Sequence, residues 1–134
     1  MFTIDYESVN GGIYRNRGQA ATITAAQRIA REGLRGLDCY HLVFIADAAT
    51  GRQVCYGERG RRGGWTFYPV TPLSREDLHH RLTGFYDHED ASDVLDRVDT
   101  LGEYQFTRTD DYGPLHWRAR RYGDGTYALD KIPA

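Results

Sequence analysis

The most acidic segment of the sequence lies between positions 87 and 111. This segment contains nine acidic residues and only two basic ones, Arg97 and Arg108, so its charge is −7. Five acidic residues within its predicted helix or flanking it are candidate contacts for a partner: Asp90, Asp93, Asp96, Asp99 and Glu103. Helical residues three apart stand about 5–6 Å from each other, in the range of successive backbone phosphates. Such a face could dock on an arginine- or lysine-lined groove of another protein. The alternative interpretation is an ordinary helix face that contacts only solvent.

A second candidate is the arginine- and glycine-rich loop at 59–65. Its residues Arg59, Arg61 and Arg62 could hold phosphates, while Trp65 supplies an aromatic ring on which a base can stack. The chain as a whole has a net charge of −2, whereas nucleic-acid-binding domains are usually basic. The competing interpretation is a solvated hairpin loop whose arginines pair with acidic residues elsewhere in the chain.

The histidines do not have the spacing of a metal site. His79 and His80 are neighbours on a predicted helix, where adjacent side chains diverge by about 100°, so the two cannot easily face one ion. His88 follows beyond that helix, and no ligand motif such as His-Glu-x-x-His occurs. We therefore predict no metal and no cofactor.

No motif for catalysis is present either. Cys39 and His41 share one face of a predicted strand, but the sequence places no acidic partner beside them. We predict no catalytic residue, and the sequence favours a protein that is not an enzyme. An enzyme with an unrecognised site is a third hypothesis, which requires a deep pocket where two or more of Cys39, His41, His116 and nearby carboxylates converge.

The length and composition indicate a single domain over 1–134 with an ordinary apolar fraction. No apolar run approaches the length that spans a membrane, and the first residues do not form a signal peptide, so we expect a cytoplasmic protein. The two cysteines are expected to be reduced, because their predicted positions are too far apart for a disulfide.

The element expected at the centre of the fold is a hairpin at 40–56. Its first strand is apolar on both faces, which predicts a strand inside a sheet that is covered on both sides. If Asp47 faces Arg52 across the turn, three pairs follow: Val43 with Tyr56, Phe44 with Cys55, and Ile45 with Val54.

Hydrophobic periodicity predicts three helices, at about 24–34, 75–86 and 91–101. Ser74 and Asp77 have the spacing of a capping box at the start of the second helix, and Leu101 closes the apolar stripe of the third. Alternating apolar residues elsewhere indicate strands near both ends of the chain and at 65–70. The predicted fold is α+β, with an antiparallel sheet of five to seven strands built around the 40–56 hairpin.

In size, single-domain build and lack of a catalytic motif, the chain resembles small phage- or plasmid-borne inhibitors. Anti-CRISPR, anti-restriction and immunity proteins are examples of this class. The resemblance implies a protein that binds and blocks another macromolecule, here through the acidic face at 90–103. The expected partner is a basic, nucleic-acid-handling protein, and direct nucleic-acid binding through the 59–65 loop is the alternative.

Overall fold

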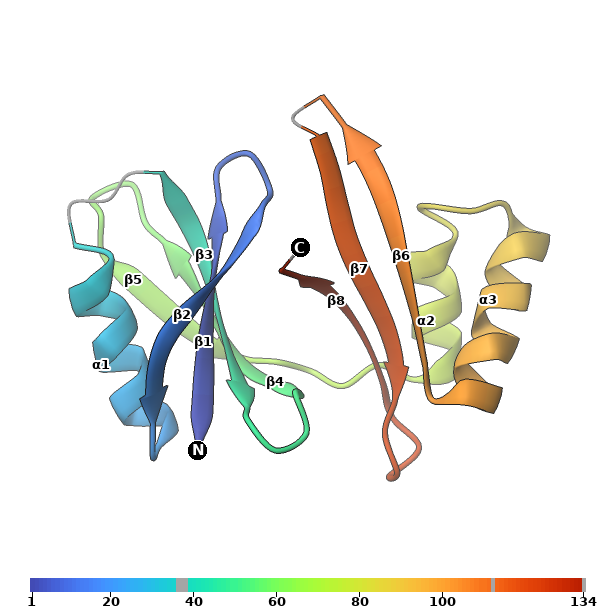
Figure 1. The fold of residues 1–134 in the computed structure, drawn as a ribbon, viewed down its shortest axis with the longest axis horizontal. Coiled ribbons are helices and arrows are strands. Elements are labelled where there is room, and N and C mark those ends of the chain that lie inside the picture. The colour runs from blue at the N-terminus through green and yellow to red at the C-terminus, as the bar shows by residue number, and fades with distance from the viewer. Residues whose placement is uncertain (36–38, 112, 134) are drawn as a thin grey trace. The chain divides into compact units, whose positions relative to one another are not determined.

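The computed structural model describes residues 1–35, 39–111 and 113–133, with only the backbone described at 15–18. The chain divides into two compact units, Met1–Val70 (unit 1) and Thr71–Ile132 (unit 2). Each unit has its own antiparallel sheet and its own helices (Figure 1), so the α+β class is confirmed. The single domain over 1–134 stays a prediction.

Unit 1 is a five-stranded antiparallel sheet with one helix on it. The strand order is β2-β1-β3-β4-β5, so the hairpin formed by β3 and β4 lies inside the sheet, as predicted. The strands are β1 (Phe2–Ser8), β2 (Ile13–Ala20), β3 (Tyr40–Asp47), β4 (Gln53–Arg59) and β5 (Trp65–Pro69). Helix α1 (Ile23–Gly33) begins after Thr22, whose side chain accepts a hydrogen bond from the backbone of Ala25. The helix lies along one face of the sheet (Figure 1).

The predicted pairing of the central hairpin is wrong by one residue. The turn itself forms as expected, because the backbone N–H of Asp47 donates to the carbonyl of Arg52 at 2.9 Å. A β-bulge then lies between Ile45 and Ala46, and Val54 is the extra residue, so Ile45 pairs with Cys55. The pairs above it follow the same shift: Phe44 with Tyr56 and Val43 with Gly57.

The core of unit 1 lies between the sheet and α1. Ile4, Val43 and Ile45 are completely buried on the sheet side, and Ala26 and Ala30 are completely buried on the helix side. Alanines on the inner face let α1 approach the strands closely. The opposite face of β3 is apolar as predicted, but its side chains Leu42 and Phe44 are only half-buried.

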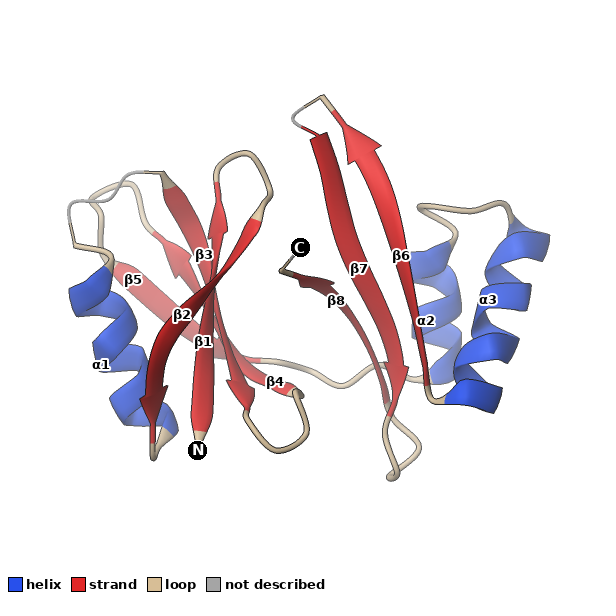
Figure 2. Cartoon of the chain, in the orientation of Figure 1, coloured by secondary structure: helices blue, strands red, loops and turns tan. Residues whose placement is uncertain are grey.

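Unit 2 packs two helices on one face of a three-stranded sheet (Figure 2). Its elements are α2 (Arg75–Leu82), α3 (His88–Leu101), β6 (Glu103–Asp110), β7 (Gly113–Arg121) and β8 (Tyr127–Ile132). Leu78, Leu82 and Val98 are completely buried between the helices and the sheet. Leu73, just before α2, exchanges two backbone hydrogen bonds with Tyr127 of β8, which fixes the start of α2 against the sheet.

The helix ends differ from the predicted ones for local reasons. The capping box is confirmed, since Ser74 and Asp77 each accept a hydrogen bond from the other's backbone. Helix α2 ends at Leu82 rather than 86, because Thr83 and Gly84 leave the helix in a tight turn. Helix α3 begins at His88 rather than 91, because Asp87 is an N-cap whose carboxylate accepts from the backbone of Asp90. No helix in the described part of the chain is long and apolar enough to cross a membrane.

Candidate functional site

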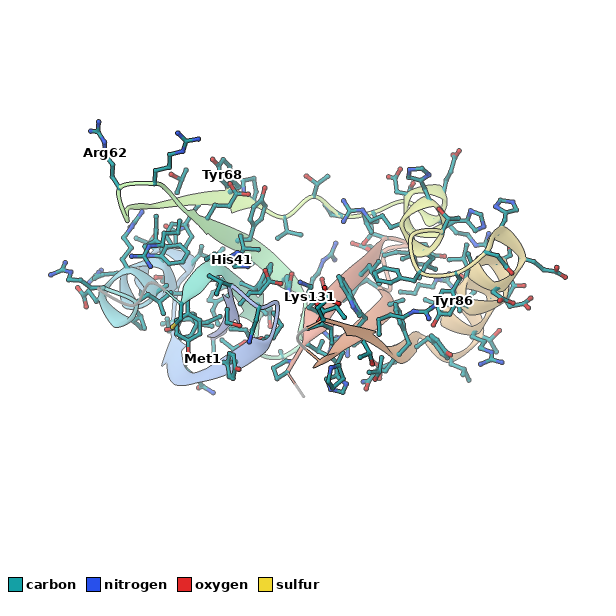
Figure 3. The ribbon with its side chains drawn as sticks, turned by 90° about the horizontal axis from the view of Figure 1, so that it is seen from above. Met1, His41, Arg62, Tyr68, Tyr86 and Lys131 are labelled. Atoms are coloured by element: carbon teal, nitrogen blue, oxygen red, sulfur yellow. The ribbon has the colours of Figure 1, made fainter. Side chains whose placement is uncertain are left out.

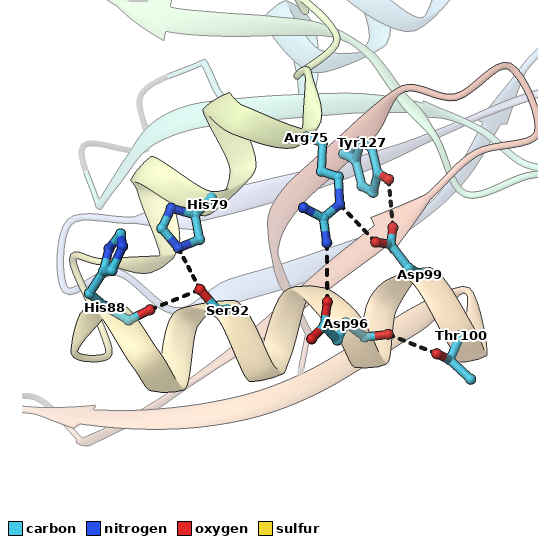
Figure 4. A network of polar contacts seen from close by, with 8 residues as sticks. All are labelled: Arg75, His79, His88, Ser92, Asp96, Asp99, Thr100 and Tyr127. Atoms are coloured by element: carbon cyan, nitrogen blue, oxygen red, sulfur yellow. Dashed lines mark hydrogen bonds and ion pairs between the residues drawn. The ribbon is translucent and has the colours of Figure 1, made fainter.

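Asp99, a predicted partner contact, is instead part of an internal polar network (Figure 4). Its carboxylate accepts a hydrogen bond from the hydroxyl of Tyr127 at 2.6 Å and from Nε of Arg75 at 2.8 Å. The bond from Tyr127, together with the guanidinium of Arg75, lowers the pKa of Asp99. The same bond raises the pKa of Tyr127. Asp99 thus joins α3 to α2 and β8 within unit 2.

Two more of the predicted contacts also have basic partners. Nη2 of Arg75 lies 3.2 Å from Oδ1 of Asp96, whose side chain is still 73% exposed. Glu103 lies 3.8 Å from Nη2 of Arg120 and is 43% exposed. Ion pairs this exposed contribute little to stability. Because most of the Asp96 side chain is exposed, Asp96 can still contact a partner.

The exposed acidic surface is a different set from the predicted one. Asp93 and Asp99 are six residues apart, which places them about 120° apart around the helix axis, so they cannot share one narrow face. Glu89, Asp93 and Asp96 follow the spacing i, i+4, i+7 and are exposed, and we call these three the acidic stripe. Asp90 is exposed at its flank. Glu89 was not among the predicted contacts, because the helix was expected to begin at 91 and not at His88.

A surface pocket of about 470 Å³ lies between α2 and α3. It is lined by Arg75, Glu76, His79, His88, Ser92 and Leu95. Nε2 of His79 lies 3.1 Å from the hydroxyl of Ser92, which donates its proton to the carbonyl of His88. Because the hydroxyl of Ser92 donates to a carbonyl, its contact with His79 does not by itself indicate an activated nucleophile. Among the described residues, no group of three or more His, Cys, Asp or Glu side chains is placed to hold a metal ion.

The residues of the enzyme hypothesis lie outside this pocket. Nε2 of His41 is 2.5 Å from the carboxylate of buried Glu7. His116 contacts the hydroxyl of Thr107 at 3.2 Å. Cys39 is exposed and Cys55 is buried, and both are free thiols. Each histidine therefore has a local contact that accounts for its position in its own unit.

The arginine loop is the turn between β4 and β5. It is closed by a hydrogen bond from the backbone N–H of Gly60 to the carbonyl of Gly64 at 2.7 Å. Arg61 and Arg62 are exposed, and Arg59 pairs with Trp65 at the base of the hairpin. Trp65 is half-buried and packs against the core of unit 1, so its ring supports the hairpin.

Comparison of the chain with protein-family models, with curated proteins and with solved structures gives no match. The functional assignment therefore depends on the exposure and charge of the side chains described above.

The internal role of Asp99 has a measurable consequence. We expect Asp99→Asn to lower the free energy of unfolding of unit 2 by about 1–2 kcal/mol, because two hydrogen bonds to a charged acceptor are weakened. Urea denaturation followed by circular dichroism measures the effect. The matched control is Asp93→Asn on the exposed side of the same helix, for which a change within about 0.5 kcal/mol is expected. Equal effects of the two variants would contradict the distinction between the network and the acidic stripe.

Proposed function

We propose that this chain is a non-enzymatic protein that binds another macromolecule through the acidic stripe of α3. The partner is a basic protein that handles nucleic acid, and the stripe occupies the groove where that protein binds phosphates. The observation that carries the proposal is the exposure of Glu89, Asp93 and Asp96 along one side of the helix. In this respect the chain would act as anti-CRISPR, anti-restriction and immunity proteins do, by blocking a partner.

The stripe is supported by a rigid element. Helix α3 has 14 residues, an N-cap at Asp87 and a left-handed C-cap at Gly102. Its inner face is fixed by buried side chains, including Leu95 and Val98. A surface that is already ordered loses little conformational freedom on binding, so more of the electrostatic attraction appears as affinity.

The charge of unit 2 also favours this interpretation. The segment 71–134 contains thirteen acidic residues and eight basic ones, which gives a charge of −5. A field of one sign around the stripe accelerates encounter with a basic surface and repels nucleic acid. We therefore expect binding that weakens as salt rises.

The proposal is tested with a triple variant, Glu89→Gln, Asp93→Asn and Asp96→Asn, on the tagged full chain. Bacterial lysate is treated with nuclease, passed over wild type and variant at low salt, and the retained proteins are quantified by mass spectrometry. We expect wild type to retain basic, nucleic-acid-handling proteins. The variant is expected to retain at most one tenth of the amount of these proteins.

The control carries the same change of charge away from the stripe. Glu58→Gln, Glu76→Gln and Asp111→Asn replace three exposed carboxylates on other elements. This control is expected to retain the same proteins as wild type. If the two triple variants retain identical sets, the stripe is not the contact surface and the proposal fails.

A further inference from the structure

Helix α1 and the residues just after it carry three exposed arginines. Arg28 and Arg31 lie about one turn apart on the helix, Arg35 follows the C-cap Leu34, and all three are exposed. The inner side of the same helix is occupied by Ala26 and Ala30, which face the sheet. The arginines therefore lie off the face of the helix that packs on the sheet.

The loop between β4 and β5 adds two more arginines beside this helix. The guanidinium carbon of Arg31 lies 4.9 Å from the ring centre of Phe67, so the outer side of α1 adjoins the strand that leaves the loop. Arg61 and Arg62 are exposed in that loop, and Arg62 extends away from the ribbon in Figure 3. We call Arg28, Arg31, Arg35, Arg61 and Arg62 the arginine surface.

The charges around the arginine surface are not balanced within unit 1. Residues 1–70 contain nine arginines and six acidic residues, a charge of +3, although the whole chain has −2. Within the described residues, none of these five arginines forms a salt bridge with a carboxylate. Glu32 is the one exposed acid on α1 beside them. Unit 1 is therefore basic, although the whole chain is slightly acidic.

We propose that the arginine surface binds the phosphodiester backbone of a nucleic acid. Guanidinium groups contact phosphate oxygens in a planar, two-pronged geometry that suits this ligand. The five exposed groups come from a helix, the residues after it and a loop, a spread that fits an extended polyanion better than a small phosphate compound. Arg28 and Arg31 are three residues apart on the helix and so stand about 5–6 Å from each other, in the range of successive backbone phosphates.

This surface lies on unit 1, so the proposal does not depend on the acidic stripe of α3. Backbone contacts carry no sequence information, and the binding is expected to be non-specific. Five phosphate contacts predict a slope of log affinity against log salt of about −4.5 for duplex DNA and about −3.5 for a single strand.

The test is fluorescence anisotropy of labelled 20-residue oligonucleotides with the full chain at low salt. Single-stranded DNA, duplex DNA and single-stranded RNA are titrated separately, and polyglutamate is the competitor that represents a general polyanion. The variants are Arg28→Gln with Arg35→Gln, and Arg61→Gln with Arg62→Gln. We expect each pair to weaken binding at least threefold, both pairs together to weaken it more than tenfold, and the combined variant to reduce the salt slope.

A matched control has the same charge change in unit 2. Arg81→Gln with Arg121→Gln removes two exposed arginines and is expected to leave the affinity within twofold of wild type. The proposal is overturned if wild type binds none of the three nucleic acids at low salt. It is equally overturned if the control pair weakens binding as much as the other pairs, or if polyglutamate competes as well as unlabelled DNA.

Discussion

Leu78→Ala is expected to lower the free energy of unfolding of unit 2 by about 2–5 kcal/mol. The side chain of Leu78 is completely buried and packs between α2, α3 and the sheet. Truncation removes buried methyl groups and leaves a cavity, because close-packed neighbours close over it only in part. The same residue packs with Leu73, which precedes the helix, so the start of α2 loses support as well.

Leu101→Ala is the matched control for this prediction. Leu101 was expected in the apolar stripe of the third helix, but it is 72% exposed at the end of α3. Its truncation should change stability by less than about 0.5 kcal/mol. Urea denaturation measured through Trp117 fluorescence, in a Trp65→Phe background, reports on unit 2. A loss below 1 kcal/mol for Leu78→Ala would contradict the packing described here.

Asp130 is expected to make stability depend on pH. Burial of its carboxylate raises its pKa from 3.8 to about 6, although Arg118 and Arg120 act in the opposite direction. Because the pKa is higher in the folded state, the contribution of this group to stability is greatest below about pH 4. It is lost as pH rises toward and through 6. Two pKa units correspond to about 3 kcal/mol between those limits.

The variant Asp130→Asn isolates this effect, since asparagine has a similar shape and does not titrate. Unfolding free energies of wild type and variant are measured by urea denaturation at several values between pH 4 and 7. Wild type is expected to lose up to about 3 kcal/mol relative to the variant over that range. Contributions of other titrating groups are common to both proteins and cancel in the difference. A difference that does not change with pH would show that Asp130 ionises normally.

Local signals predicted the elements well where one interaction dominates. The Ser74–Asp77 capping box forms as expected, and the apolar run in β3 places that strand inside the sheet. Helix ends were less predictable, because α3 begins at the N-cap Asp87 and not at the first apolar residue. The expected single sheet of five to seven strands is a five-stranded sheet, with a separate three-stranded one in unit 2.

The candidate site was predictable as a helix but not as a set of side chains. Sequence spacing alone does not show that Asp99 faces Tyr127, because these residues meet only when α3 packs on β8. The arginines between 28 and 35 were missed for a related reason. They are spread over eight positions in the sequence, and they adjoin the 59–65 loop only because Arg31 lies over Phe67.

The bulge at Val54 bears on how this hairpin can change in length. Because Val54 is the extra residue, its loss would let Gln53 and Cys55 pair consecutively and leave every later pair of β4 as it is. Loss of a residue further along the strand would instead move each following side chain to the other face of the sheet. Natural variation in length among relatives of this hairpin should therefore fall at position 54 or in the 48–52 turn.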